Sequence, residues 1–203
     1  MKSSFGKNCR VTVFGGSHED RIGVVLEGFP EGFHPDLEKL QRFMDRRAPG
    51  NSPYATSRKE PDVVEVDTDS PLTLFIRNTN FRSGDYKELS QVPRPGHADY
   101  TARIKYGDSV NMAGGGPFSG RMTAPLCIAG GLAMQVLSQY GIQVGAHISS
   151  IGDKQDEYFN PSEIPQTLLA SLSESDFAVI SKDAGEEMKR LILDAKIQGD
   201  SVG

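Results

Sequence analysis

The 203-residue chain is 37% hydrophobic and 24% charged, which excludes a wholly disordered protein and suffices for one domain with a buried core over residues 1–203. Its formal net charge of −5 argues against a general nucleic-acid binder, whose surface is dominated by Lys and Arg. No apolar run approaches a membrane span and the first residues lack the hydrophobic segment of a signal peptide, so we expect a cytoplasmic protein.

Hydrophobic periodicity predicts an alternation of strands and helices without internal repeats. In chain order the pattern predicts strands at 9–14 and 22–28, a helix at 37–47, strands at 62–66 and 72–79, helices at 100–106 and 122–137, a strand at 142–151, and helices at 161–172 and 184–197. Pro125 stands either in the first turn of the long apolar helix or at a kink within it. Cys9 and Cys127 have neither disulfide nor metal-ligand spacing and are predicted to be reduced thiols in the core.

Two of the four histidines stand on glycine-containing turns. A glycine turn after the first predicted strand presents Ser17 and His18, and a Pro-Gly pair directly precedes His97. Imidazoles presented in this way are accessible and titrate near neutrality, which favours proton-transfer chemistry. His34 and His147 lack such a context and are expected to be structural or surface residues.

Charged and glycine-rich segments follow each histidine motif. Asp99 is predicted to cap the helix at 100–106 by accepting from its free amides. Arg94 is suited to forking onto a phosphate or carboxylate, or is an ordinary surface arginine. The triple glycine Gly114–Gly116 either brings backbone amides close to an anion or is a flexible turn that lets the next helix pack.

Together these residues resemble chorismate synthase. The resemblance runs from about Ser4 to the C-terminus in six ordered motifs, at 15–18, 45–50, 58–62, 94–100, 105–107 and 114–121. The block Arg-Pro-Gly-His-Ala-Asp-Tyr at 94–100 is the most specific. One such motif would be weak, whereas six in the family's order are specific.

The resemblance implies an α+β fold, a layered β-α-β sandwich of which this chain is about the N-terminal half. It also implies a lyase of the shikimate pathway, in aromatic amino acid biosynthesis. Chorismate synthase converts 5-enolpyruvylshikimate 3-phosphate to chorismate by an anti 1,4-elimination that releases phosphate. The reaction requires reduced FMN, which makes the enzyme a flavoprotein although the flavin is not consumed overall.

The family's functional residues carry over onto matching positions. By resemblance His18 lies near the leaving phosphate and His97 protonates the reduced flavin. Substrate contacts are implied for Arg47, Arg94, Ser119 and Arg121. Flavin contacts are implied for Gly115, Gly116 and Ser119. No metal ligand is implied.

Partners also follow from the resemblance. The intact family forms homotetramers, so a homo-oligomer is expected, with a small-molecule substrate and neither nucleic acid nor membrane as a partner. A flavin-reductase segment is not evident in this chain. An external supply of reduced FMN is therefore the simpler hypothesis, with NADPH as the alternative source of reducing equivalents.

Several positions depart from the family pattern. In the first motif Gly16 replaces a glutamate and Glu19 replaces a glycine. Pro53 stands where a basic residue is usual, and Pro117 begins a Pro-Phe-Ser sequence in place of Arg-Ser-Ser. The stretch 66–72 is shorter than the family's loop, and the last residues resemble the middle of the family sequence.

Two alternatives remain open from the residues. The repeated His-x-Asp spacing of His18 with Asp20 and of His97 with Asp99 also suits a metal-dependent phosphoesterase. The altered motifs also suit a non-catalytic module that binds flavin or an anion.

Overall fold

The computed structural model describes residues 2–47, 53–54, 61–67, 71–79, 92–109 and 113–203. Contacts group the chain into two compact units. The first comprises Met1–Ala48 and Lys59–Val136, and the second comprises Pro49–Arg58 and Leu137–Gly203. The single domain predicted over residues 1–203 remains a prediction.

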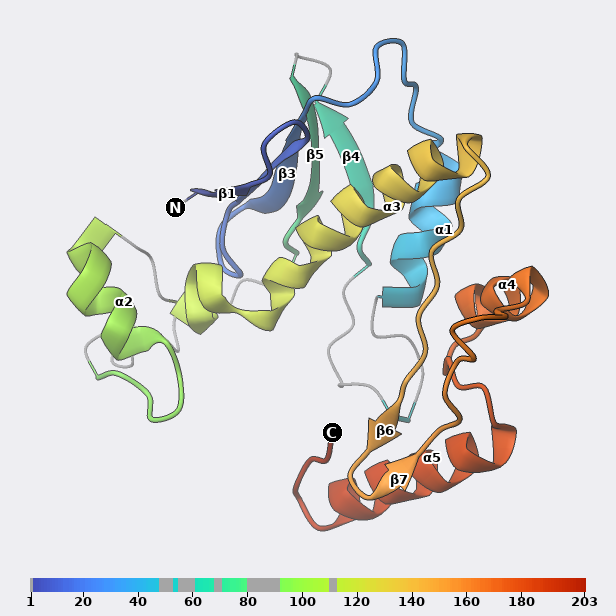
Figure 1. Ribbon diagram of the computed structural model, residues 1–203. Coiled ribbons are helices and arrows are strands. Elements are labelled where there is room, and N and C mark those ends of the chain that lie inside the picture. Colours follow the sequence, from blue (N-terminus) through green and yellow to red (C-terminus); the bar gives the residue numbers. More distant parts are fainter. Residues whose placement is uncertain (1, 48–52, 55–60, 68–70, 80–91, 110–112) are drawn as a thin grey trace. The chain divides into compact units, whose positions relative to one another are not determined.

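A five-stranded antiparallel sheet is the centre of the first unit (Figure 1). Its strands are β1 Lys2–Phe5, β2 Arg10–Phe14, β3 Arg21–Glu27, β4 Val64–Asp67 and β5 Leu72–Arg77. Their order is β1-β2-β3-β5-β4, and each neighbouring pair is antiparallel. The four strands predicted in this unit are confirmed. Strand β1 was not predicted, because its sequence Lys-Ser-Ser-Phe has no apolar alternation.

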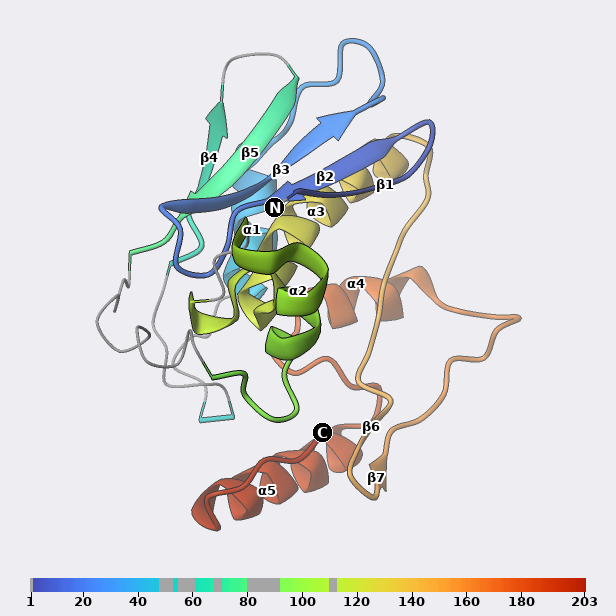
Figure 2. The same ribbon diagram turned by 90° about the vertical axis from the view of Figure 1, so that its left-hand side faces the viewer.

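Helices α1 (Leu37–Arg47) and α3 (Thr123–Gln139) pack against one face of this sheet (Figure 1 and Figure 2). The core between them consists of fully or almost fully buried side chains: Ile22, Val24, Leu40, Met44, Leu74, Ile76, Ile128 and Leu132. Gly131 lets the two helices approach closely, since a Cβ there would stand 2.7 Å from Cδ1 of Leu40. Pro125 is the third residue of α3, so its predicted first-turn position is confirmed.

Aromatic and arginine side chains cover the other face of the sheet. Phe14 and Phe75 lie over Gly23, where a Cβ would stand 2.5 Å from Cζ of Phe14 and 2.7 Å from Cβ of Phe75. The guanidinium carbons of Arg21 and Arg77 lie 4.7 and 5.5 Å from the centre of the Phe75 ring. These cations shield Phe75 from water, and the residue is 5% exposed.

Four further helical segments are described in the first unit. Helix α2 (Asp99–Tyr106) is followed by three short 3₁₀ helices, η1 Gly107–Ser109, η2 Ala113–Phe118 and η3 Gly120–Met122. Helix η2 is interrupted at Gly114–Gly116, whose backbone angles are not helical. Cys127 is partly buried against the core, as predicted. Cys9 is exposed, so its predicted core position is wrong, because Cys9 lies in the turn between β1 and β2.

The second unit contains a short hairpin and two helices. These are β6 Ser150–Ile151, β7 Lys154–Gln155, α4 Gln166–Glu174 and α5 Lys182–Ile197. Predicted helix 184–197 is confirmed. Predicted helix 161–172 begins later, because Pro165 occupies the extended N-cap position. None of the described helices is long and apolar enough to cross a membrane.

The predicted strand at 142–151 is wrong for all but its last two residues. Residues 142–149 have no strand assignment, and most of their side chains are at least partly exposed. An alternating sequence forms a strand only when a neighbour pairs with its backbone. Beyond the helix-end bond from the Ile142 amide to the Leu137 carbonyl, the described backbone bonds of 142–149 run from the Ile148 amide to the Ala178 carbonyl (2.7 Å) and from the Asp156 amide to the Ser149 carbonyl (2.9 Å).

Asp156 is a buried carboxylate that organises the second unit. It accepts from the amides of Ile180 and Ser181 (2.6 and 2.8 Å), immediately before α5, and lies 2.8 Å from Nδ1 of His147. Burial opposes ionisation, but these hydrogen bonds outweigh it and lower the pKa of Asp156. His147 is 9% exposed at its side chain, which confirms its predicted structural role.

Replacing this carboxylate should destabilise the chain. Asp156→Ala is expected to lower the free energy of unfolding by about 3 kcal/mol, because buried amides lose their acceptor, whereas the exposed Asp153→Ala should change it by less than about 0.5 kcal/mol. A carboxyl whose pKa is lowered by folding stabilises the folded state at pH values above its unfolded-state pKa. The difference in unfolding free energy between the two variants should therefore narrow below about pH 4. Urea unfolding at several pH values measures both effects, and equal midpoints for the two variants would contradict them.

Candidate functional site

The loop between β2 and β3 carries the first predicted histidine. Gly15 turns the chain with φ of 90°, as the glycine pattern predicted. Ser17 is 1% exposed, and its amide donates to the Gly116 carbonyl (3.3 Å) while its hydroxyl donates to that of Gly114 (3.3 Å). The same hydroxyl lies 3.1 Å from Nδ1 of His18. The loop is therefore attached to the triple glycine.

The triple glycine lies against both predicted catalytic histidines. Gly114, Gly115 and Gly116 have φ values of 61°, 100° and 50°, which favour glycine. A Cβ at Gly114 would stand 1.9 Å from Cε1 of His18, and a Cβ at Gly115 would stand 3.2 Å from Nε2 of His97. The structure thus brings together two imidazoles that are 79 positions apart, with bare backbone at each ring.

Asp99 joins the other two members of its motif. Its Oδ1 lies 2.6 Å from Nδ1 of His97. Arg94 donates to its carboxylate through Nε (2.6 Å), through a terminal nitrogen (2.8 Å) and through the backbone amide (3.0 Å). The hydrogen bonds from the Arg94 guanidinium hold the pKa of Asp99 well below its usual range, although burial acts in the opposite direction.

The predicted capping role of Asp99 is wrong. The N-cap of α2 is Ala98, and no side chain caps the helix. Asp99 is the first helical residue, and its carboxylate turns to Arg94 and His97 instead. A charged guanidinium with parallel donors outcompetes neutral backbone amides for a carboxylate.

A second buried carboxylate, Asp62, holds two of the predicted substrate-binding arginines. Its side chain is fully buried and forms ion pairs with both Arg47 and Arg121. The side chains of these arginines are 19% and 5% exposed. Two guanidinium groups share one carboxylate, so the formal charges leave one positive charge in excess. The cluster is therefore suited to an anion.

Asn78 connects this cluster to the His18 loop. Its side-chain amide donates to the carbonyls of Gly16 (3.2 Å) and Glu19 (2.7 Å), and its oxygen lies 3.4 Å from Nε of Arg121. Sequence reasoning assigned no role to Asn78 or to Asp62. The available signal was a polar residue near the end of a predicted strand for Asn78, and a place inside the third motif, 58–62, for Asp62.

Ser119 joins the glycine segment to Arg121. Its amide donates to the Gly116 carbonyl (3.3 Å), and its hydroxyl accepts from the Arg121 amide (3.2 Å) as the N-cap of η3. All the predicted site residues lie in the first unit. Hydrogen bonds and ion pairs link His18, Ser119, Arg121 and Arg47, whereas Arg94, His97 and Asp99 form a second bonded group that adjoins the first at Gly115. Arg58 and Lys59 of the third motif, and residues 68–70 of the 66–72 stretch, lie outside the described residues.

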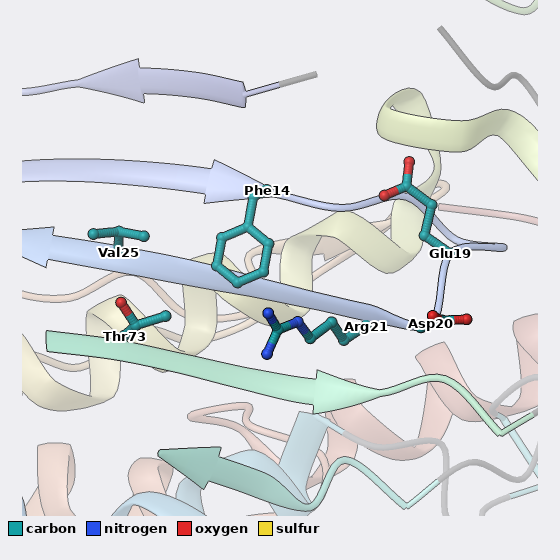
Figure 3. Close-up of a pocket in the computed structure, with 6 residues that line it drawn as sticks. All are labelled: Phe14, Glu19, Asp20, Arg21, Val25 and Thr73. Atoms are coloured by element: carbon teal, nitrogen blue, oxygen red, sulfur yellow. The ribbon is translucent and has the colours of Figure 1, made fainter. Parts of the chain in front are cut away.

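A separate hollow lies on the face of the sheet that carries Phe75. Phe14, Glu19, Asp20, Arg21, Val25 and Thr73 line it (Figure 3). Asp20 lines this hollow, whereas Asp99 is bonded to Arg94. Within the described part of the chain, no three His, Cys, Asp or Glu side chains are arranged to hold a metal ion. The phosphoesterase alternative lacks the cluster that it needs.

Comparisons with known proteins agree with these motifs. A family model described as "Chorismate synthase" matches residues 9–203. The chorismate synthases of Lancefieldella parvula and Aeropyrum pernix are 37% and 38% identical to the chain over 222 and 210 residues. Both alignments cover 100% of this chain but only 58% and 54% of the relative. The chain thus spans about half the length of these curated relatives.

One solved structure gives the same result for the fold. It is described as "Crystal Structure of Chorismate Synthase" and is 24% identical in sequence. It superposes with a TM-score of 0.71 over 97% of this chain and 55% of that one. The predicted fold class, the α+β layered sandwich of this type, is confirmed.

Adding a methyl group at Gly114 should disturb the site. Gly114→Ala is expected to lower the free energy of unfolding by about 2 kcal/mol, because of the left-handed backbone and the overlap with His18. Gly120→Ala is a matched control in the same segment, since nothing lies within 4 Å of a Cβ there and its φ is not positive. Thermal and urea unfolding measure the difference, and two equally stable variants would refute it.

Proposed function

Since the chain belongs to the chorismate synthase family, we propose that the protein carrying it is a chorismate synthase. Its reaction is then the anti 1,4-elimination of phosphate from 5-enolpyruvylshikimate 3-phosphate. The observation that supports this most directly is the glycine segment lying against both His18 and His97. The order of the six motifs and the match over residues 9–203 support it as well.

Charge complementarity supports the proposed substrate. The substrate carries a phosphate and two carboxylates, which need fixed cations. Arg47 and Arg121 supply one charge beyond that of Asp62. Arg94 and Ser119 complete the proposed substrate-binding set. Asp99 offsets the charge of Arg94 and accepts from two of its five guanidinium N–H groups, so its proposed contribution is directional hydrogen bonding.

The residues present fit reduced FMN at the glycine segment. Gly115 and Gly116 carry no Cβ, so no side chain of their own separates their backbone from a bound ligand. Ser119 lies next to them, with its Cβ 3.4 Å from a Cβ built at Gly115. When bound, reduced FMN supplies the electron-rich ring that the overall reaction returns unchanged.

The two histidines have separate proposed tasks. His18 holds a proton close to the leaving phosphate, where an acid eases departure of the anion. His97 exchanges a proton through Nε2, the ring atom that faces Gly115. Both tasks suit an imidazole because its ordinary titration range lies near neutrality.

The proposal includes the wider context of the family. It places the enzyme in the cytoplasm as a homotetramer, with small molecules rather than nucleic acid or membrane as its ligands. Reduced FMN is taken from an external source, with NADPH as the alternative supply. Detection of NADPH-dependent FMN reduction by the purified protein would favour that alternative.

An anaerobic assay tests the function on the protein in its native length. With photoreduced FMN and 5-enolpyruvylshikimate 3-phosphate, chorismate and phosphate should appear in equal amounts. Phosphate without chorismate would indicate a phosphoesterase and overturn the proposal. Binding of both ligands without either product would instead favour a non-catalytic module.

Replacing either histidine should slow turnover in that protein. His18→Ala and His97→Ala are each expected to lower kcat about 10²- to 10⁴-fold, which is the usual contribution of a positioned acid or base. His34→Ala is the matched control, because His34 is exposed and outside the site. Steady-state assays at saturating FMN measure the ratio. Wild-type rates for both site variants would remove these residues from the proposed mechanism.

A further inference from the structure

Asp99 connects two of the proposed functional side chains and is itself neither a cap nor a proposed ligand. Its carboxylate is bonded to Arg94 and lies 2.6 Å from Nδ1 of His97. We infer that Asp99 is a positioning residue, which holds His97 in the Nδ1–H tautomer and so presents Nε2 to the glycine segment. This inference rests on the proposed function for its catalytic consequence, but not for its geometry.

The ionisation state of the Asp99 carboxylate determines which ring nitrogen of His97 carries the proton. The side chain of Asp99 is 10% exposed, and Arg94 donates to both of its oxygens. An ionised carboxylate only accepts hydrogen bonds. The 2.6 Å contact with His97 therefore requires a proton on Nδ1. A neutral imidazole carries one ring proton, so Nε2 then has its lone pair available.

Arg94 also approaches the same ring nitrogen. A terminal nitrogen of its guanidinium lies 3.3 Å from Nδ1 of His97. A guanidinium is a donor only, so this contact would require a lone pair on Nδ1 and the opposite tautomer. The two contacts exclude each other. The contact with the carboxylate (2.6 Å) is 0.7 Å shorter than the contact with the guanidinium (3.3 Å) and is charge-assisted. The carboxylate therefore determines the tautomer.

The opposite edge of the ring faces the glycine segment. A Cβ at Gly115 would stand 3.2 Å from Nε2 and 3.5 Å from Cε1 of His97. No hydrogen bond to Nε2 is recorded within the described ranges. A proton that enters or leaves His97 does so at Nε2, on the side where the flavin site is proposed. Asp99 thus fixes both the orientation of the ring and the atom that exchanges the proton.

Nuclear magnetic resonance of ¹⁵N-labelled chain tests the tautomer without any ligand. At about pH 8.5 an unperturbed imidazole is neutral, and the wild-type His97 ring is expected to show a protonated Nδ1 and an unprotonated Nε2. Asp99→Asn should shift His97 toward the other tautomer, because the amide can donate to Nδ1. Asp99→Glu should restore part of the Nδ1–H signal. A wild-type ring protonated on Nε2 would overturn the inference even if every variant failed to fold.

Kinetics on the native-length protein test the catalytic consequence. Asp99→Asn should lower kcat by about 10²-fold or more, as loss of a carboxylate that orients a histidine does elsewhere, with a smaller change in KM. Asp99→Glu should recover part of the loss, and the exposed Asp153→Asn should match wild type. An active protein unaffected by Asp99→Asn would refute the positioning role alone. No turnover by wild type, with the tautomer as expected, would refute the proposed function and leave the geometry standing.

Discussion

The close approach of bare backbone to two imidazole rings constrains the rest of the first unit. At Gly114 a single added carbon would overlap the His18 ring, and the backbone there is left-handed. The glycine segment can take this place only because Ser17 and Ser119 hold it through the Gly114 and Gly116 carbonyls. Segments that are far apart in the chain therefore meet at a strip of backbone that carries no side chains of its own.

Buried carboxylates fix the arginines around this strip. A buried charge is tolerated only when a partner neutralises it, and each aspartate here has at least one guanidinium. Asp62 takes two arginines and leaves a net positive charge, whereas Asp99 takes Arg94 and leaves none. Of these two described groups, the Asp62 cluster is the one whose formal charges leave a positive excess that suits an anion. Around Asp99 the same kind of pairing serves orientation instead of attraction.

Local patterns predicted the elements that depend on local physics. Apolar spacing identified α1 and a continuous apolar run identified α3, because both helices pack against the sheet. It failed at 142–151, where strand formation depends on a partner that the pattern cannot contain. The same limit applied to Asp99, since the choice between capping amides and Arg94 is made by side chains meeting in space. Asn78 was missed for a related reason: its partners are backbone carbonyls of a loop about 60 positions earlier.

The two histidines differ in how firmly their tautomers are set. His97 faces an acceptor-only carboxylate, which permits one arrangement of its ring protons. His18 faces the hydroxyl of Ser17, whose single proton points to the Gly114 carbonyl or, after rotation of the hydroxyl, to Nδ1 of His18. A ring next to a hydroxyl can exchange its proton at either nitrogen without breaking an ion pair. His18 is therefore suited to a proton that must follow a departing group, and His97 to one delivered repeatedly at a single atom.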